Sequence, residues 1–154
     1  MVRIVFVCLG NICRSPMAEG VMRHLVAKHG LSHQIEVDSA GTSRYHIGEQ
    51  PHHGTMRVLR QNGIELHHAA RQFTDDDADN FDILVAMDTS NYADMQATIG
   101  KTKDVHLMLD FIPNGRKGRD VPDPWYTGNF EHVYDLLVQA CEGLLAYVKA
   151  EYLK

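Results

Sequence analysis

The sequence predicts an α/β fold in which a parallel sheet carries helices on both faces. Short, almost continuously apolar segments recur along the chain, as expected of strands buried on both sides. Between them lie segments whose apolar residues recur at helical spacing. No linker or shift in composition divides the chain, so we expect one domain over residues 1–154.

The first predicted unit is a strand followed by a helix. Residues 3–9 (RIVFVCL) are almost continuously apolar and rich in β-branched side chains, which is typical of a buried strand. After the polar loop GNICRS, Ser15 is predicted to cap a helix that has Pro16 at its first position. Gly30 is predicted to end this helix.

The same alternation continues along the rest of the chain. Strands are predicted over residues 34–40, 81–87 and 105–109, and helices over residues 53–62 and 88–99, the second capped by Asp88 or Thr89. A polar loop covers residues 110–129, and a long helix begins at Phe130. Folds of this kind bind ligands beyond the carboxyl ends of their strands, so we expect the chemistry in the loop after the first strand.

The bulk composition narrows the classes of function. The net charge is −5, from 20 acidic and 15 basic side chains, so we expect neither a nucleic-acid surface nor a membrane surface. The three cysteines are too few, and odd in number, to form a disulfide framework. No signal peptide or bilayer-length apolar run is evident, and a cytoplasmic protein is expected.

The loop from Cys8 to Ser15 (CLGNICRS) has the features of an anion site. It joins a buried strand to a helix start, where unpaired N–H groups and the helix dipole favour a bound anion. Gly10 and Asn11 both tolerate positive φ, so the loop can curl into a nest of inward N–H groups. Arg14 offers a planar, two-pronged donor to phosphate oxygens. Cys8 would lie beneath the phosphorus as a thiolate, with a hydrogen bond from Ser15.

This loop resembles the signature of the low-molecular-weight protein tyrosine phosphatases. The match is carried by VCLGNICRSPMAE at the first loop, and it covers essentially the whole chain. DSAGTS, ARQFT, AMDTSN and PDPWY are similar to family segments and stand in the expected order. The resemblance implies a doubly wound, four-stranded parallel sheet, a covalent phosphocysteine intermediate, and no metal or other cofactor.

The resemblance also assigns roles to individual residues. It implies Cys8 as the nucleophile, Arg14 as the phosphate-binding residue and Asp123 as the general acid. The substrate-binding residues that it implies are Leu9, Gly10, Asn11, Ile12, Cys13, Ser15, Tyr45, Trp125 and Tyr126. Asn11, Ser15 and His68 resemble the hydrogen-bond network that holds the phosphate loop. Many members carry Tyr where this chain has Trp125. Implied partners are phosphate-like anions and tyrosine-phosphorylated proteins, a partner tyrosine kinase among them.

Some of these residues have a second interpretation from spacing alone. Asp123 lies between Pro122 and Pro124 and fits an ordinary turn as well as a catalytic acid. Core packing is an alternative for the aromatic residues, and it suits Tyr45 better than Trp125. The histidine pairs at 52–53 and 67–68 are not expected to bind metal. Adjacent side chains diverge, and no cysteine or carboxylate stands at a finger-like spacing.

Three other functions compete with the phosphatase. An arsenate reductase of the same fold would need a further pair of nearby cysteines, and this chain has none between Cys13 and Cys141. A non-catalytic phospho-ligand binding module would not need Cys8, Arg14 and Asp123 together. A nucleotide-binding domain would carry G-x-G-x-x-G after its first strand, which is missing.

Overall fold

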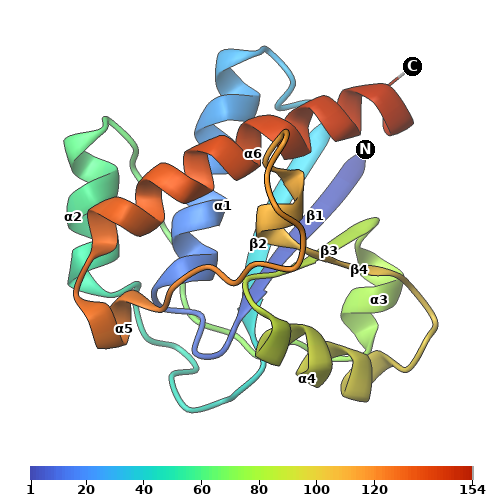
Figure 1. Cartoon of the computed structure of the whole chain (residues 1–154), viewed down its shortest axis with the longest axis horizontal. Helices are drawn as coiled ribbons and strands as arrows, with labels where there is room; N and C mark the ends of the chain where they lie inside the picture. The colour runs from blue at the N-terminus through green and yellow to red at the C-terminus, as the bar shows by residue number, and fades with distance from the viewer. Residues whose placement is uncertain (154) are drawn as a thin grey trace.

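Four parallel strands form one sheet in the order β2-β1-β3-β4 in the computed structural model, which describes residues 1–153 (Figure 1). The strands are β1 (Val2–Cys8), β2 (Ile35–Gly41), β3 (Ile83–Ala86) and β4 (Val105–Leu107). The predicted four-stranded α/β fold is therefore confirmed. All three neighbouring pairs run parallel, with Cys8 opposite Gly41 at the carboxyl end of β1.

The period-2 alternation of β1 divides the core into two layers. Ile4, Phe6 and Cys8 pack toward α1 (Arg14–Lys28), α2 (His53–Gln61) and α6 (Phe130–Tyr152). Val5 and Val7 pack on the other face, where α3 (Asp76–Asn80) and α4 (Thr89–Ile99) lie (Figure 1). A strand buried on both faces needs apolar residues at every position, and this is why residues 4–8 form one continuous apolar run.

The chain leaves β1 toward opposite sides of the sheet in its two crossovers. From β1 the chain crosses first to β2 on one side and later to β3 on the other. The loops after β1 and β3 therefore diverge at the carboxyl edge of the sheet and leave a crevice between them. This is where the sequence predicted the chemistry.

Several predicted boundaries are wrong by a few residues. Helix α1 begins at Arg14, with Cys13 at its N-cap position, so Ser15 is not the cap. The Ser15 hydroxyl lies instead 3.0 Å from the Cys8 sulfur. At α4 the prediction is confirmed, because the Asp88 carboxylate accepts the Asn91 N–H at 2.7 Å.

Three short elements were not predicted. They are α3, the 3₁₀ helix η1 (Met108–Phe111) and α5 (Pro124–Thr127), and the last lies inside the predicted polar loop. Within residues 1–153, no helix combines the length and apolarity that crossing a bilayer requires.

Candidate active site

The loop between β1 and α1 curls around the carboxyl end of β1. Asn11 adopts a left-handed conformation with φ of 58°, whereas Gly10 keeps a negative φ. At position 10 the glycine serves close packing and not the positive φ that was predicted. A Cβ there would lie 3.0 Å from the ring of His46, so the missing side chain lets the loop approach residue 46 closely.

The Asn11 side chain fixes the left-handed turn. Its amide donates to the hydroxyls of Ser15 at 2.9 Å and Ser39 at 3.0 Å. Its carbonyl oxygen accepts from His68 Nε2 at 2.7 Å and from the Arg71 backbone N–H at 3.0 Å. All four hydrogen-bonding positions of the amide are therefore satisfied although the residue is fully buried. This offsets the cost of positive φ in a non-glycine residue.

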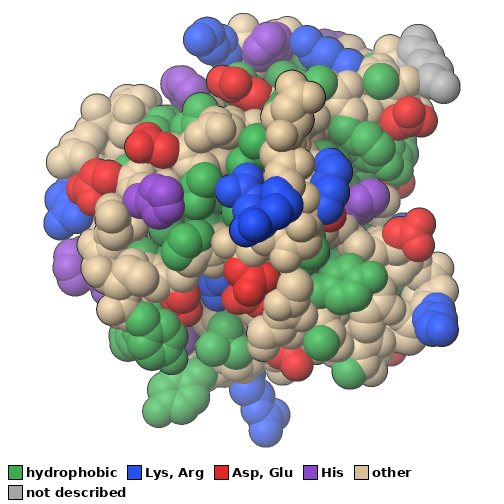
Figure 2. Space-filling model, in the orientation of Figure 1, with side chains coloured by type: hydrophobic (Ala, Val, Ile, Leu, Met, Phe, Trp, Pro, Cys, Tyr) green, Lys and Arg blue, Asp and Glu red, His purple; other side chains and the backbone are tan. Residues whose placement is uncertain are grey.

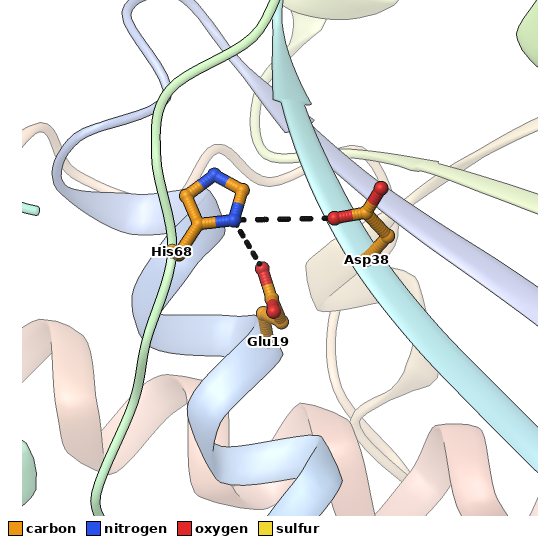
Figure 3. Close-up of side chains that lie close together, drawn as sticks. All are labelled: Glu19, Asp38 and His68. Carbon is orange, nitrogen blue, oxygen red and sulfur yellow. Dashed lines mark ion pairs between the residues drawn. The ribbon is translucent and has the colours of Figure 1, made fainter. Parts of the chain in front are cut away.

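Behind the loop, His68 lies between carboxylates (Figure 3). Its Nδ1 is 3.1 Å from Glu19 and 3.9 Å from Asp38. Nε2 faces the carbonyl oxygen of Asn11, so both ring nitrogens face oxygen atoms of other side chains. Burial opposes the charge of Glu19, but hydrogen bonds from His68 and Ser39 outweigh it and hold its pKa below the ordinary value.

This triad also has the spacing of a metal site. The ligand atoms of Glu19, Asp38 and His68 lie within 4.8 Å of one another. However, Glu19 already accepts from Ser39, and Asp38 accepts from Arg71 at 3.0 Å. Both ring nitrogens of His68 already face oxygen atoms at hydrogen-bonding distance. The arrangement therefore fits a network that supports Asn11 better than a metal centre.

Cys8 and Cys13 share the loop but have different surroundings. The Cys8 sulfur accepts the Asn11 backbone N–H at 3.3 Å. The Ser15 hydroxyl accepts a hydrogen bond from Asn11, and its own proton has two acceptors in reach, the Cys8 sulfur at 3.0 Å and the Ala40 carbonyl at 3.4 Å. The Cys13 pKa is instead raised to about 12, first by burial and then by the charges of Cys8 and Asp123. Cys13 stays a thiol at neutral pH, and only Cys8 receives donors suited to a thiolate.

Arg14 is buried and held in one orientation. Its Nη1 donates to Asp88 at 2.7 Å and to the Val121 carbonyl at 2.9 Å. Burial opposes its charge, but Cys8 and Asp88 outweigh this effect and raise its pKa. Neither Nε nor Nη2 takes part in a hydrogen bond within residues 1–153, so this pair of parallel donors remains for an anion.

Asp123 caps the short helix α5. Its Oδ1 accepts the Trp125 N–H at 3.1 Å, and its Oδ2 lies 3.6 Å from Arg14 Nη2. The capping bond explains why the polar loop contains a helix at Pro124–Thr127, and it turns the second carboxylate oxygen toward the arginine.

A cavity of about 450 Å³ opens over this loop, within the usual size range of ligand pockets. The side chains of Cys8, Arg14 and Asp123 line it. So do most of the predicted pocket residues: Leu9, Gly10, Ile12, Cys13, Tyr45, Trp125 and Tyr126. Tyr45 is 86% exposed and Trp125 54% exposed, so core packing is excluded for both. The side chains of Asn11 and Ser15, which were also predicted to contact substrate, are fully buried and do not line the cavity, so their contact with substrate stays a prediction.

Three side chains that support or line the site were not selected from the sequence. Asp88 was predicted only as a helix cap, yet it also orients Arg14. Glu19 lies on a helix whose apolar stripe gave no reason to select it, and His46 lines the cavity beside Trp125, their ring centroids 6.0 Å apart. The prediction that adjacent histidines diverge is wrong for His52 and His53, whose rings stack at 4.3 Å.

Comparisons with known proteins agree with this geometry. The sequence profile described as "Low molecular weight phosphotyrosine protein phosphatase" matches residues 3–154. The low molecular weight protein-tyrosine-phosphatase YfkJ of Bacillus subtilis is 46% identical over 98% of both chains, and its crystal structure superposes with a TM-score of 0.94 over 99% of this chain and 97% of that one.

Two further relatives widen the comparison. The low molecular weight protein-tyrosine-phosphatase PtpA of Staphylococcus aureus is 40% identical over 96% of this chain and 94% of its own. A Drosophila arginine phosphatase is 34% identical, with a TM-score of 0.85 over 96% of this chain and 98% of that one. The profile match and these identities span nearly the whole sequence, and the chain therefore belongs to the low molecular weight phosphotyrosine protein phosphatase family.

Proposed function

We propose that this chain hydrolyses phosphotyrosine in proteins through a covalent phosphocysteine intermediate. Cys8 is the nucleophile, Arg14 the phosphate clamp, and Asp123 the general acid and then the base. The observation that carries the proposal is the cavity itself. These three side chains line it together, and the aromatic rings of Tyr45, Trp125 and Tyr126 line the same space.

In the first step, the Cys8 thiolate attacks phosphorus and the bond from phosphorus to the tyrosine oxygen breaks. Asp123 gives its proton to the departing phenolate oxygen. The Nε–H and Nη2–H of Arg14, with the loop N–H groups, stabilise the charge on the phosphoryl oxygens. The hydrogen bonds from Ser15 and the Asn11 N–H support the thiolate before attack.

In the second step, water attacks the phosphocysteine. Asp123, now a carboxylate, takes a proton from the water as its oxygen bonds to phosphorus. The sulfur–phosphorus bond breaks, inorganic phosphate leaves, and Cys8 returns to the thiolate. The same Ser15 hydroxyl that supported the nucleophile then stabilises it as a leaving group.

Phosphoarginine hydrolysis is a second candidate, because one of the similar structures is an arginine phosphatase. A guanidinium group needs acceptors for its several N–H groups. Asp123 is the only carboxylate that lines the cavity within residues 1–153, and Ile12 and Leu9 add apolar surface. Such a wall suits a phenyl ring better than a guanidinium group, so phosphotyrosine is preferred.

Arsenate reduction receives no support from Cys141. This cysteine is completely buried in α6, and its thiol lies 3.9 Å from the Ala18 carbonyl. Burial raises its pKa far above the ordinary value. A disulfide relay needs a reachable thiolate, which Cys141 does not offer.

The natural substrates in this proposal are tyrosine-phosphorylated proteins. The first protein substrate to test is a partner tyrosine kinase that carries phosphotyrosine. The three cysteines are free and buried, which supports a reducing compartment such as the cytoplasm.

The test compares four substrates at equal concentration: nitrophenyl phosphate and peptides that carry phosphotyrosine, phosphoserine or phosphoarginine. We expect turnover of the two aryl phosphates, inhibited by vanadate, and little turnover of phosphoserine. Cys8→Ser should lower aryl turnover by at least about 10³-fold while inorganic phosphate still raises the melting temperature. Faster turnover of phosphoarginine would favour the second candidate, and near-native activity of Cys8→Ser would contradict the covalent mechanism.

A further inference from the structure

A second hollow lies along the exposed side of α2. Val58 and Leu59 on the inner side of this helix are buried in the core. The outer side carries residues at helical spacing, and together with Gln50 and Pro51 they line a groove of about 540 Å³. We call this the α2 groove; its lining residues are Gln50, Pro51, His53, Met56, Arg57, Arg60 and Gln61.

The α2 groove is cationic although the chain as a whole carries a net charge of −5. Arg57 and Arg60 contribute positive charge, and no carboxylate lines the groove within residues 1–153. Arg57 lies 3.5 Å from Glu131, but both side chains are more than half exposed, so this ion pair is weak. The groove therefore attracts negative charge.

A row of rings connects the groove to the catalytic cavity. The Trp125 ring, which lines the cavity, meets the His52 ring edge-on at 5.6 Å. The His52 ring stacks on that of His53, which lines the groove, at 4.3 Å. The His52 backbone N–H also donates to the Ile12 carbonyl at 2.7 Å, which ties the start of α2 to the phosphate loop. The two hollows are therefore fixed relative to each other.

Another basic surface lies in the middle of the face shown in Figure 2, over the loop that precedes α5. That loop carries Arg116, Lys117 and Arg119. Two of these side chains are already used within the loop. Lys117 Nζ donates to the Asp110 carbonyl at 2.6 Å and Arg119 Nε to the Arg116 carbonyl at 3.3 Å. These cations brace their own loop, whereas those of the α2 groove face a hollow.

We propose that the α2 groove binds acidic residues of the protein substrate near the phosphotyrosine in sequence. This inference rests on the proposed function and names a substrate class for the same site. The occupant is an extended peptide segment that carries Asp or Glu. Such a segment would run from the cavity along the row of rings from Trp125 to His53 and bring its acidic side chains to Arg57 and Arg60.

The test uses two phosphotyrosine peptides that differ only in their flanks, with Glu in one and Gln in the other. Wild type is compared with the double variant Arg57→Gln/Arg60→Gln. The control is Lys28→Gln/Lys101→Gln, which removes the same charge from exposed sites. Lys28 ends α1 and Lys101 follows α4, so both lie at the amino edge of the sheet, opposite the site.

We expect wild type and the control to prefer the acidic peptide by about three- to tenfold in kcat/KM, with the preference falling as salt is added. The α2 double variant should lose most of this preference and keep wild-type turnover of nitrophenyl phosphate, which is too small to reach the groove. Each single variant should lose part of the preference for the acidic peptide. A graded loss of this kind indicates a charge effect and not misfolding of the double variant.

Two results would overturn the inference while leaving the proposed function intact. One is equal turnover of both peptides by wild type, and the other is full acidic preference in the α2 variants. Failure of wild type to hydrolyse nitrophenyl phosphate and both peptides would instead overturn the proposed function.

Discussion

Two cysteines in one short loop differ because their neighbours differ. Cys8 ends β1, accepts a hydrogen bond from the Asn11 backbone N–H and lies 3.0 Å from the Ser15 hydroxyl. Cys13 lies five positions further on among buried groups, where its pKa rises to about 12. A negative charge at Cys8 itself opposes a second one at Cys13, so the loop favours one thiolate at a time.

At the residue scale, the site candidates that could be selected from the sequence are those that lie within a short local motif. Cys8 and Arg14 lie in one loop, and Asp123 lies in a rigid Pro-Asp-Pro segment. The residues that orient Arg14 and Asn11 come from other elements, so a local motif does not contain them. Asp88 reaches Arg14 from 74 positions away, and His68 reaches Asn11 from 57. Only the folded sheet edge brings such side chains together.

Asp123→Asn tests whether the carboxyl group acts as an acid or only caps α5. Asparagine can still accept the Trp125 N–H, so the cap should survive. A phenol with an unperturbed pKa of about 10 leaves poorly without a proton, whereas nitrophenolate needs little help. We expect phosphotyrosine turnover to fall by about 10²–10⁴-fold and nitrophenyl phosphate turnover distinctly less.

The measurement is a series of aryl phosphates of graded leaving-group pKa, run on wild type and on Asp123→Asn, with thermal melts of both proteins. An equal loss across the series, in step with a lower melting temperature, would make Asp123 a structural residue and leave the acid unidentified.

At the element scale, long helices were predictable and short helices were not. The helices α1, α2, α4 and α6 contain enough residues to display their periodicity. The strands β3 and β4 are short, but each lies within a longer apolar segment that was predicted as a strand, residues 81–87 and 105–109. By contrast, α3, α5 and η1 have five residues or fewer, so no repeat can be read from them. Their ends are set by single bonds such as the Asp123 cap, which depend on the folded loop.

The contact of η1 with α6 depends on a glycine inside the helix. A Cβ at Gly143 would collide with the backbone carbonyl oxygen of Phe111 at the end of η1. Replacing a helical glycine by alanine normally stabilises a helix by about 1 kcal/mol. Here we expect the opposite sign. Overpacking against the backbone should cost about 1–3 kcal/mol and lower the melting temperature of Gly143→Ala by several degrees.

The matched control is Glu142→Ala, one position earlier on the exposed side of α6. Its stability should stay within about 0.5 kcal/mol of wild type. Urea melts of the three proteins measure both effects, and a Gly143→Ala protein more stable than wild type would show that η1 can move away without loss.

At the scale of the whole molecule, the fold class followed from the alternation of strands and helices, because parallel strands need crossover helices. Periodicity alone does not give the order β2-β1-β3-β4, since it depends on which side of β1 each crossover returns. The resemblance to a known family supplied the four-stranded, doubly wound sheet. The link between the α2 groove and the catalytic cavity could not be predicted for a similar reason, because it needs His52 to lie against Trp125, 73 positions away.

The buried titratable groups together predict how stability depends on pH. Burial lowers the pKa of His106, and burial with the charges of His53 and Arg57 lowers that of His52. Below the ordinary value of 6.5, the unfolded chain therefore binds protons that the folded chain refuses. Glu19 acts in the same direction below 4.5, because its folded carboxylate resists protonation. Stability should thus fall as pH drops through about 6.5 and fall again below about 4.5.

The cysteines set the alkaline limit. Burial raises the pKa of Cys13 to about 12 and raises that of Cys141 as well. Above the ordinary thiol value of 9.0, unfolded thiols lose protons that the folded ones keep, so unfolding becomes more favourable as pH rises. We expect the melting temperature to be highest between about pH 6.5 and 9, measured under reducing conditions. In Cys141→Ala the melting temperature should fall less steeply above pH 9 than in wild type. In His106→Gln it should fall less steeply as the pH drops through about 6.5. Both expectations concern the slope with pH and hold whatever each substitution does to stability at neutral pH. A melting temperature that keeps rising from pH 9 to 10.5 in wild type would contradict the burial of these thiols as the cause.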